Sequence, residues 1–326
     1  MDSILDLNIP IMIFIQNLGT WLEIPMKVIT FLGNEEFYLL VMPILYWCIN
    51  ASLGIRLGAM LLLSGSVNSL LKMLFHSPRP YWYSSQIRGI IHGSGFGFPS
   101  GHSQNAVSLW GLTAASIKRR WAWIGAAVIA FLIGFSRIYL GVHFPIDVLA
   151  GWAVGAVMLW AFLALEKPLM AWLKKQSLGA QIAVCFGVSL LIIGAGFLAK
   201  QSLGGWQVPD HWIQNSGTDL NPHSLEGFFT TAGTLFGLGA GALLLSHVKG
   251  SLDVSGAFYQ RLLRYVIGLV GVIAFYAGLD ALFPEGETLL ALGLRFIRYL
   301  LVGLWISLGA PLVFHRLKLL PASSNA

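Results

Sequence analysis

Long apolar runs separated by short polar segments extend through almost the whole chain. Runs of this kind that can cross about 30 Å of hydrocarbon are typical of transmembrane helices. They fall at residues 37–55, 57–75, 99–117, 121–141, 144–165, 178–199, 228–247, 265–283 and 299–314. The pattern predicts an all-α fold, a polytopic transmembrane helical bundle.

Residues 1–34 follow this pattern less well. Ile9 to Ile15 is a short apolar run, but polar, charged and proline residues interrupt the segment on both sides. A helix of this kind can lie in the membrane interface. We predict an interfacial or partly inserted helix here, and a poor first span is the alternative.

Composition supports a membrane protein. Of the 326 residues, 56% are hydrophobic and 10% are charged, whereas soluble domains are nearer a quarter charged. The mean hydropathy of +0.73 excludes a water-soluble globule, and disorder needs the opposite composition. Cys48 and Cys185 both lie in apolar runs, so they build neither a disulfide framework nor a cysteine-based zinc site.

Basic residues cluster on one predicted side of the membrane. They occur at Arg56, at 118–120, between 167 and 175, between 249 and 264, and between 315 and 318. The positive-inside rule makes this side cytoplasmic. The outer side then receives the loops at 76–98, 142–143, 200–227 and 284–298.

Two arginines fit this topology poorly. Arg295 and Arg298 fall near the outer end of the last apolar run. Charges inside a membrane are costly unless they are paired. We therefore expect Asp280, Glu285 or Glu287 to pair with them.

Acidic residues are absent between Phe37 and Ile146, and the first to follow is Asp147. The bases that this topology leaves on the outer side of that stretch are Lys72, Arg79, Arg88 and Arg137. Many cations and one carboxylate suit an anion, and they suit Mg²⁺ or Ca²⁺ poorly because those ions need several oxygen ligands. Taken singly, each base could instead contact lipid head groups.

The first of three local patterns joins Lys72 to Arg79 and Pro80. Proline removes a backbone donor and clashes with the preceding helical turn. Pro78 and Pro80 therefore end the helix that carries Lys72, and Arg79 is held in an outer loop near it. Alone, the pattern also fits a helix end with two interfacial bases.

The second pattern is the run from Pro99 to Ser103, which opens an apolar run. Pro99 and Ser100 indicate a helix start, where unpaired N–H groups and the helix dipole favour an anion. Gly101 allows a ligand to approach the backbone closely, and His102 lies in the first turn. The alternative is a plain helix cap with an interfacial histidine.

The third pattern places Arg137 before His143 and Asp147. Residues four apart share one face of a helix. A carboxylate bonded to one imidazole nitrogen leaves the other free as a nucleophile. Pro145 is tolerated because it falls in the first turn of the next span. A buried pair that only satisfies itself is the alternative.

Together the three patterns resemble the signature motifs of the type 2 phosphatidic acid phosphatase superfamily. The residues that match are Lys72, Arg79, Pro80, Pro99, Ser100, Gly101, His102, Ser136, Arg137, His143 and Asp147. The resemblance covers about residues 37–165 and leaves out 167–326. Soluble members of the superfamily are excluded by composition, so the membrane lipid phosphatase branch is expected.

The resemblance implies a role for each catalytic residue. His143 is the nucleophile that forms a phosphohistidine, Asp147 orients it, and His102 protonates the leaving alcohol and then activates water. The residues implied to bind the phosphoryl oxygens are Lys72, Arg79, Ser100, Gly101 and Arg137. The family needs no metal and no cofactor, which agrees with phosphoryl transfer by positioning and charge stabilisation.

The leading hypothesis is an integral membrane lipid phosphatase, a metal-independent phosphoric ester hydrolase. Its substrates would be phosphate or diphosphate esters of phosphatidate, phosphatidylglycerophosphate or isoprenoid diphosphate type. A lipid phosphotransferase that passes the phosphoryl group from His143 to another alcohol is one alternative. A lipid transporter with a vestigial site is another. In the outer loop, His76, Arg88, His92 and residues 81–83 could set head-group choice or serve as interfacial anchors.

The domain prediction divides the chain near residue 166. Residues 1–166 would form a six-helix-type catalytic core, and 167–326 would add three to four transmembrane helices of open role. Gly233, Gly237 and Gly241 form a small-residue stripe that permits close helix packing, although glycine is common in membrane helices.

The loop 200–226 is expected to reach over the outer face as a lid or an exposed loop. Its residues Asp210, His211, Asp219 and His223 could resemble a metal site, but their spacing is irregular. We predict a multi-pass protein of a bacterial inner (plasma) membrane with its site facing outward. The expected partners are a lipid phosphate substrate and membrane lipids, without nucleic acid, and a homo-oligomer stays open.

Overall fold

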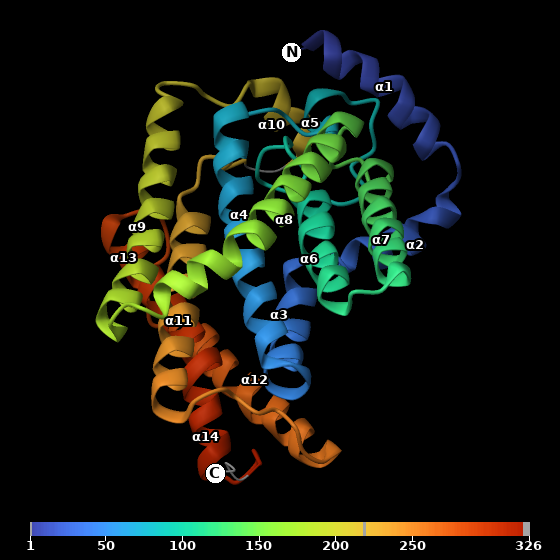
Figure 1. The fold of residues 1–326 in the computed structure, drawn as a ribbon. Coiled ribbons are helices and arrows are strands. Elements are labelled where there is room, and N and C mark those ends of the chain that lie inside the picture. The colour runs from blue at the N-terminus through green and yellow to red at the C-terminus, as the bar shows by residue number, and fades with distance from the viewer. Residues whose placement is uncertain (1, 218–219, 322–326) are drawn as a thin grey trace. The chain divides into compact units, whose positions relative to one another are not determined.

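A computed structural model of the chain describes residues 2–217 and 220–321. Helices make up 77% of the chain, and the described residues contain no strand. Seven of the described helices are long and apolar enough to cross a membrane. The prediction of an all-α polytopic bundle is confirmed (Figure 1).

Most of the helices follow one another with short connections, and the loop 84–100 between α5 and α6 is longer. In the first part of the chain they are α1 (Asp2–Gln16), a 3-10 turn (Thr20–Leu22), α2 (Glu23–Phe31), α3 (Glu35–Ile44), a π-helical turn (Leu45–Ile49), α4 (Ala51–Phe75), α5 (Pro80–Tyr83), α6 (Gly101–Ile117), α7 (Arg120–Tyr139) and α8 (Pro145–Leu173). The rest are α9 (Leu178–Ser202), α10 (Asp210–Ser216), α11 (Glu226–Lys249), α12 (Phe258–Asp280), α13 (Leu289–Leu304), a second π-helical turn (Trp305–Gly309) and α14 (Ala310–Arg316).

The chain folds into two compact units. The first unit comprises Met1–Tyr38, Val67–Leu163 and Phe197–Ser224, and the second comprises Leu39–Ser66, Ala164–Gly196 and Leu225–Ala326. These units are defined by packing. The predicted division near residue 166 concerns function and stays a prediction.

Seven of the predicted spans coincide with helices that are long enough to cross a membrane. The predicted span at 37–55 joined the end of one helix to the start of another. The helix that begins with α3 ends at Asn50, whose backbone is extended (φ −155°, ψ 102°), and α4 begins after it. The prediction at 99–117 corresponds to α6, which has 17 residues. The apolar pattern therefore located the helices, but it did not locate the break before α4.

An aromatic core ties together one end of the first unit. Trp82, Phe96 and Tyr139 are almost fully buried there, and they pack with Met26 of α2 and Trp212 of α10. The Trp206 and Phe96 rings lie 5.7 Å apart between centroids. Because such rings bury large apolar areas, this core fixes the predicted outer loops 76–98 and 142–143 and most of the predicted loop 200–227 against one another.

Helices α6 and α8 approach closely within the first unit. A Cβ atom on Gly151 would lie 2.5 Å from the Ser100 carbonyl oxygen, and one on Gly155 would lie 2.5 Å from that of Gln104. Small residues let helix backbones approach in this way. The start of α6 is consequently held beside the first turns of α8.

The second unit contains a π-helical turn that two side chains complete. Pro311 has no N–H, so the carbonyls four and five residues before it, on Ser307 and Ile306, lose their helical donor. The Tyr46 hydroxyl donates to the Ser307 carbonyl at 3.2 Å, and the Trp47 indole donates to that of Ile306 at 2.9 Å. These bonds satisfy carbonyls that would otherwise be costly in a membrane.

The two arginines near the end of the last run are both paired. Arg298 forms an ion pair with Asp280, as predicted, and its guanidinium also lies over the rings of Tyr276 and Tyr299. Arg295 pairs with Glu226 at 2.6 Å. The prediction of Asp280, Glu285 or Glu287 for Arg295 was wrong, because its partner comes from the start of α11.

The glycine stripe of α11 faces α13 and the π-helical turn that follows it. A Cβ atom on Gly233 or Gly237 would collide with the carbonyl oxygens of Phe296 or Leu300, and one on Gly241 would collide with Ser307 Oγ. The close packing that the spacing allowed is therefore present in the second unit.

We expect Gly237→Ala to destabilise the second unit. The added methyl group meets main-chain atoms of α13, which cannot rotate away, and overpacking typically costs about 1–3 kcal/mol. The measurement is the temperature at which purified protein in detergent loses its monodisperse elution peak. Gly278→Ala in α12 is the matched control, because nothing lies within 4 Å of its added Cβ. Equal melting of both variants and wild type would contradict this packing.

Candidate active site

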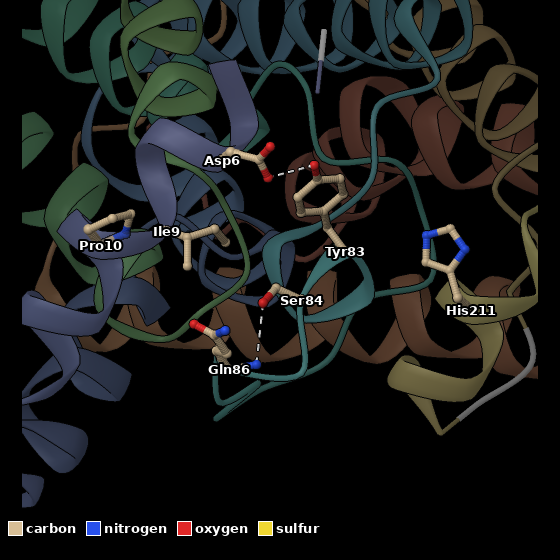
Figure 2. Close-up of a pocket in the computed structure, with 7 residues that line it drawn as sticks. All are labelled: Asp6, Ile9, Pro10, Tyr83, Ser84, Gln86 and His211. Atoms are coloured by element: carbon tan, nitrogen blue, oxygen red, sulfur yellow. Dashed lines mark hydrogen bonds between the residues drawn. The ribbon is translucent and has the colours of Figure 1, made fainter. Parts of the chain in front are cut away.

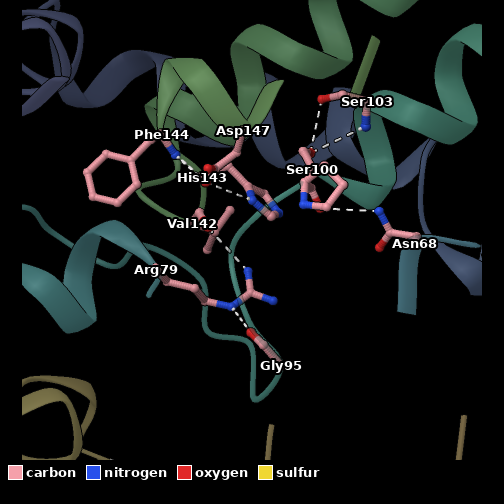
Figure 3. Close-up of polar contacts among 10 residues, drawn as sticks. Asn68, Arg79, Gly95, Ser100, Ser103, Val142, His143, Phe144 and Asp147 are labelled. Carbon is pink, nitrogen blue, oxygen red and sulfur yellow. Dashed lines mark hydrogen bonds and ion pairs between the residues drawn. The ribbon is translucent and has the colours of Figure 1, made fainter. Parts of the chain in front are cut away.

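Arg79 follows the end of α4 and stands immediately before α5. Its Nε donates to the Gly95 carbonyl at 2.7 Å and its Nη1 to the Val142 carbonyl at 3.2 Å (Figure 3). The guanidinium carbon lies 5.8 Å from the centre of the Trp82 ring. The predicted helix end is confirmed, since α4 stops at Phe75. Arg79 is thus fixed between the loop that contains Gly95 and the turn after α7.

Ser100 begins α6 as predicted. Its Oγ accepts a bond from the Ser103 N–H at 3.4 Å and one from the Ser103 hydroxyl at 3.0 Å (Figure 3). From α4, the Asn68 amide donates to the Pro99 carbonyl at 3.2 Å. A Cβ atom on Gly101 would lie 2.8 Å from Asn68 Oδ1. A larger residue at position 101 would therefore require the Asn68 amide to move.

His143 and Asp147 meet where α8 begins. His143 lies in the turn before Pro145, and its Nδ1 is 3.4 Å from Asp147 Oδ2. The same carboxylate oxygen accepts a bond from the Phe144 N–H at 2.9 Å. Both side chains are buried, with 1% and 0% exposure. The predicted pair therefore forms across the start of a helix, with Pro145 in the first turn.

A main-chain hydrogen bond connects the segment of the second pattern to that of the third. The Ser100 N–H donates to the Asp147 carbonyl at 3.0 Å. This bond places the first turn of α6 beside the first turn of α8, so Ser100, Gly101 and His102 are held near the His143–Asp147 pair.

Burial keeps the His143 imidazole neutral. Desolvation lowers its pKa well below the usual range, and the charges of Arg79, Arg137 and Lys72 lower this pKa further. These charges disfavour the imidazolium. With Nδ1 turned toward Asp147, the neutral ring can use Nε2 as a nucleophile.

Arg137 lies at the end of α7 and contacts α2. Its Nη1 donates to the Thr30 hydroxyl at 2.7 Å. One turn later along the chain, Asn34 Oδ1 lies 2.9 Å from the Nε2 atom of His102. A Cβ atom on Gly33 would lie 2.9 Å from His102 Cδ2. The segment after α1 therefore holds two side chains that the sequence analysis had assigned to the site.

These contacts face a cavity of about 490 Å³ in the first unit. The residues that line it are Lys27, Thr30, Asn34, Ile91, His92, His102 and Arg137. Three of them come from the segment that the sequence analysis treated as interfacial. A signal for them was present, because Lys27, Thr30 and Asn34 are spaced three and four apart and so form one polar face in a mainly apolar segment.

The outer-loop candidates have different surroundings. His92 lines the cavity beside His102. Arg88 pairs with Glu23 at 3.4 Å. Tyr81 and Trp82 are buried in the aromatic core and are not exposed at an interface.

The 200–226 loop does not form a metal centre in the described part of the chain, where no cluster of three or more His, Cys, Asp or Glu residues occurs. His211 lines a second cavity with Asp6, Tyr83 and other residues (Figure 2). His223 packs its ring against Phe96. Asp219 lies outside the described residues.

Comparison with known proteins separates two segments. Residues 53–170 match the family model of the PAP2 superfamily. Residues 229–324 match a second model, the transmembrane extension of PAP2 superfamily phosphatases. Phosphatidylglycerophosphatase B of Bacillus subtilis (strain 168) is 34% identical over 154 residues, which cover 42% of this chain and 72% of that protein. The chain belongs to the PAP2 superfamily.

Other PAP2-related proteins are similar over different lengths. Glucose-6-phosphatase 3 of Homo sapiens is 31% identical over 216 residues, which cover 59% of this chain and 62% of that protein, less than two thirds of its length. A crystal structure of a transmembrane PAP2 type phosphatidylglycerolphosphate phosphatase from Bacillus subtilis is 26% identical, with a TM-score of 0.44 and coverage of 52% of this chain and 88% of that one.

Membership in the PAP2 superfamily confirms the resemblance seen in the three patterns. It also identifies the protein as a multi-pass integral membrane protein of a phosphatase family. The C-terminal match was missed from the sequence, because the sequence analysis found no catalytic motif in residues 229–324.

Proposed function

We propose that this protein is a lipid phosphatase that hydrolyses lipid phosphate or diphosphate esters through a phosphohistidine on His143. The observation that carries the proposal is the buried His143–Asp147 pair. The charges of Arg79 and Arg137 lie close enough to lower the pKa of its imidazole. A neutral nucleophile surrounded by fixed cations suits attack on an anionic phosphoryl group. The membrane fold and the phosphatase family support a lipid substrate.

In the first step His143 Nε2 attacks phosphorus and the bond to the leaving oxygen breaks. Asp147 stabilises the positive charge that the imidazole gains. The phosphoryl oxygens are bound in the transition state of this displacement by the side chains of Lys72, Arg79 and Arg137. The Ser100 hydroxyl and the N–H groups near Gly101 also bind them. Hydrogen bonds set the positions of Arg79, Arg137 and Ser100 before substrate arrives, which is the condition for effective electrostatic stabilisation.

His102 is the proposed general acid for the leaving group. Asn34 Oδ1 lies 2.9 Å from Nε2 of His102 and, as an acceptor, keeps a proton on that nitrogen. When His102 is in its doubly protonated imidazolium form, a leaving oxygen that takes the place of the amide oxygen receives this proton and the ring becomes neutral. His102 then accepts a proton from water, which attacks phosphorus, breaks the bond to His143 and releases inorganic phosphate.

We expect His143→Ala to abolish phosphate release from lipid phosphates, by at least about 10³-fold, because no other group replaces the nucleophile. Asp147→Asn should retain a small residual rate. The assay measures inorganic phosphate from a panel of lipid phosphates in detergent, with and without an acceptor lipid. A phosphorylated acceptor in place of free phosphate would indicate a phosphotransferase.

His247→Ala is the matched control for His143→Ala, because His247 is an exposed histidine in the last turn of α11. It should leave the rate unchanged. Activity near wild type in a folded His143→Ala variant would overturn the phosphohistidine proposal.

Metal independence is part of the same proposal. Because cations of the protein take the phosphoryl oxygens, phosphate release should survive EDTA. Orthovanadate should inhibit, since a pentacoordinate oxyanion resembles the transition state that the basic cluster stabilises. The measurement compares initial rates with EDTA, with added Mg²⁺ and with vanadate. Strict dependence on Mg²⁺ together with resistance to vanadate would contradict a site of this kind.

We further propose that the site faces outward from the inner membrane of a bacterial cell. The distribution of basic loops supports this orientation. In a variant without Cys48 and Cys185, a cysteine at Ser85 should react with an impermeant thiol reagent in intact cells, and one at Lys118 should not. Both positions are exposed and lie in the first unit. The reverse labelling pattern would place the site on the cytoplasmic side.

A further inference from the structure

The main-chain position of Arg79 depends on a helix of a single turn. Arg79 stands immediately before α5, and its carbonyl accepts bonds from the Trp82 and Tyr83 N–H groups, both at 3.0 Å. A helix of four residues is not stable on its own, because nucleation of a helical turn is unfavourable. The contacts that α5 makes with other segments must therefore keep Arg79 in place.

Two of these contacts come from α10. The Asn215 side-chain amide donates to the Trp82 carbonyl at 2.9 Å. The last carbonyls of a helix have no partner within it, so this bond caps the C-terminal end of α5. Trp212 packs against the Trp82 ring, with 6.2 Å between the ring centroids, and both rings are buried.

Trp82 connects these contacts to Arg79. Besides the bond from its N–H, the centre of its ring lies 5.8 Å from the guanidinium carbon. An indole ring attracts a cation at this distance. The same guanidinium donates to the Gly95 and Val142 carbonyls (Figure 3). A Trp82 ring that Trp212 keeps in place therefore limits the movement of the Arg79 side chain.

The helix α10 lies outside both segments that match family models, 53–170 and 229–324. It belongs to the same compact unit as Arg79. Trp212 is one of the rings of the aromatic core, so its packing alone could serve stability. Asn215 is exposed and buries little apolar area, so its contribution is the hydrogen bond to α5.

We propose that α10 keeps the phosphoryl-binding arginine in position, with Asn215 and Trp212 as positioning residues that act through Trp82. This inference rests on the proposed phosphatase function, in which Arg79 binds the phosphoryl oxygens. The two residues do not contact the substrate. They limit the movement of α5, so that the guanidinium meets the transferred group without reorganisation, as electrostatic stabilisation requires.

The first measurement is hydrogen exchange at the amides of residues 82–84 in protein purified in detergent, which requires no turnover. These amides donate to the Arg79 and Pro80 carbonyls. In Asn215→Ala their exchange should become about threefold to tenfold faster, as expected for the loss of one hydrogen bond. Gln214→Ala is the matched control, because Gln214 is an exposed neighbour on the same helix. It should leave the exchange unchanged.

The second measurement compares kcat/KM, for the best substrate of the lipid panel, with the inhibition constant of orthovanadate. In Asn215→Ala the first should fall and the second should rise, both about threefold to tenfold, because vanadate resembles the transition state whose oxygens Arg79 binds. A purely structural defect reduces the fraction of active protein, which lowers the rate and leaves the inhibition constant unchanged. Trp212→Leu should change both quantities further in the same direction, and Trp212→Phe, which keeps an aromatic ring, should restore most of the difference.

Faster exchange in α5 together with a raised inhibition constant supports the role of α10. Unchanged exchange in Asn215→Ala, or faster exchange with an unchanged inhibition constant, would overturn it. Asn215→Ala decides the outcome if Trp212→Leu does not fold, because replacing an exposed residue leaves the aromatic core intact. Wild-type protein that releases phosphate from no lipid of the panel would instead overturn the phosphatase function, and the exchange measurement would still decide whether α10 stabilises α5.

Discussion

Burial of the Asp147 carboxylate is the constraint on which the rest of the site depends. A buried charge is costly unless nearby groups compensate it. The Phe144 N–H and His143 take one carboxylate oxygen, while the backbone carbonyl of the same residue receives the Ser100 N–H. One residue therefore positions His143, the proposed nucleophile, and also ties α8 to the first turn of α6. The close backbone contact at Gly151 keeps this arrangement in register.

The fold could be predicted from the sequence where one helix corresponded to one apolar run. It could not be predicted at Asn50, because apolar residues on both sides concealed a break that depends on the backbone of one residue. The π-helical turn before Pro311 was equally hidden. Its free carbonyls are satisfied by Tyr46 and Trp47, which lie more than 250 residues earlier in the sequence, so no local pattern reports it.

The residues of the candidate site also divide into those that the sequence indicates and those that it does not. Lys72, Arg79, Ser100, His102, Arg137, His143 and Asp147 could be named from the sequence because each lies in a short local pattern at a helix end. Thr30 and Asn34 could not, since their partners Arg137 and His102 are distant in the chain. Their polar face on α2 was visible, but a polar face fits an interfacial helix equally well. Only the packing of α2 against the end of α7 distinguishes these two interpretations.

This division has a physical reason. The groups proposed to bind the transferred phosphoryl group need a fixed geometry, which helix ends and backbone bonds provide. They lie within the segment that matches the PAP2 model, 53–170. Other parts of the cavity wall come from outside this segment. Lys27, Thr30 and Asn34 lie before that segment, and α10, which packs on Trp82, lies after it. The matched segment therefore holds the residues of the proposed phosphoryl chemistry, while the walls of the cavity beside His102 come partly from a helix outside it.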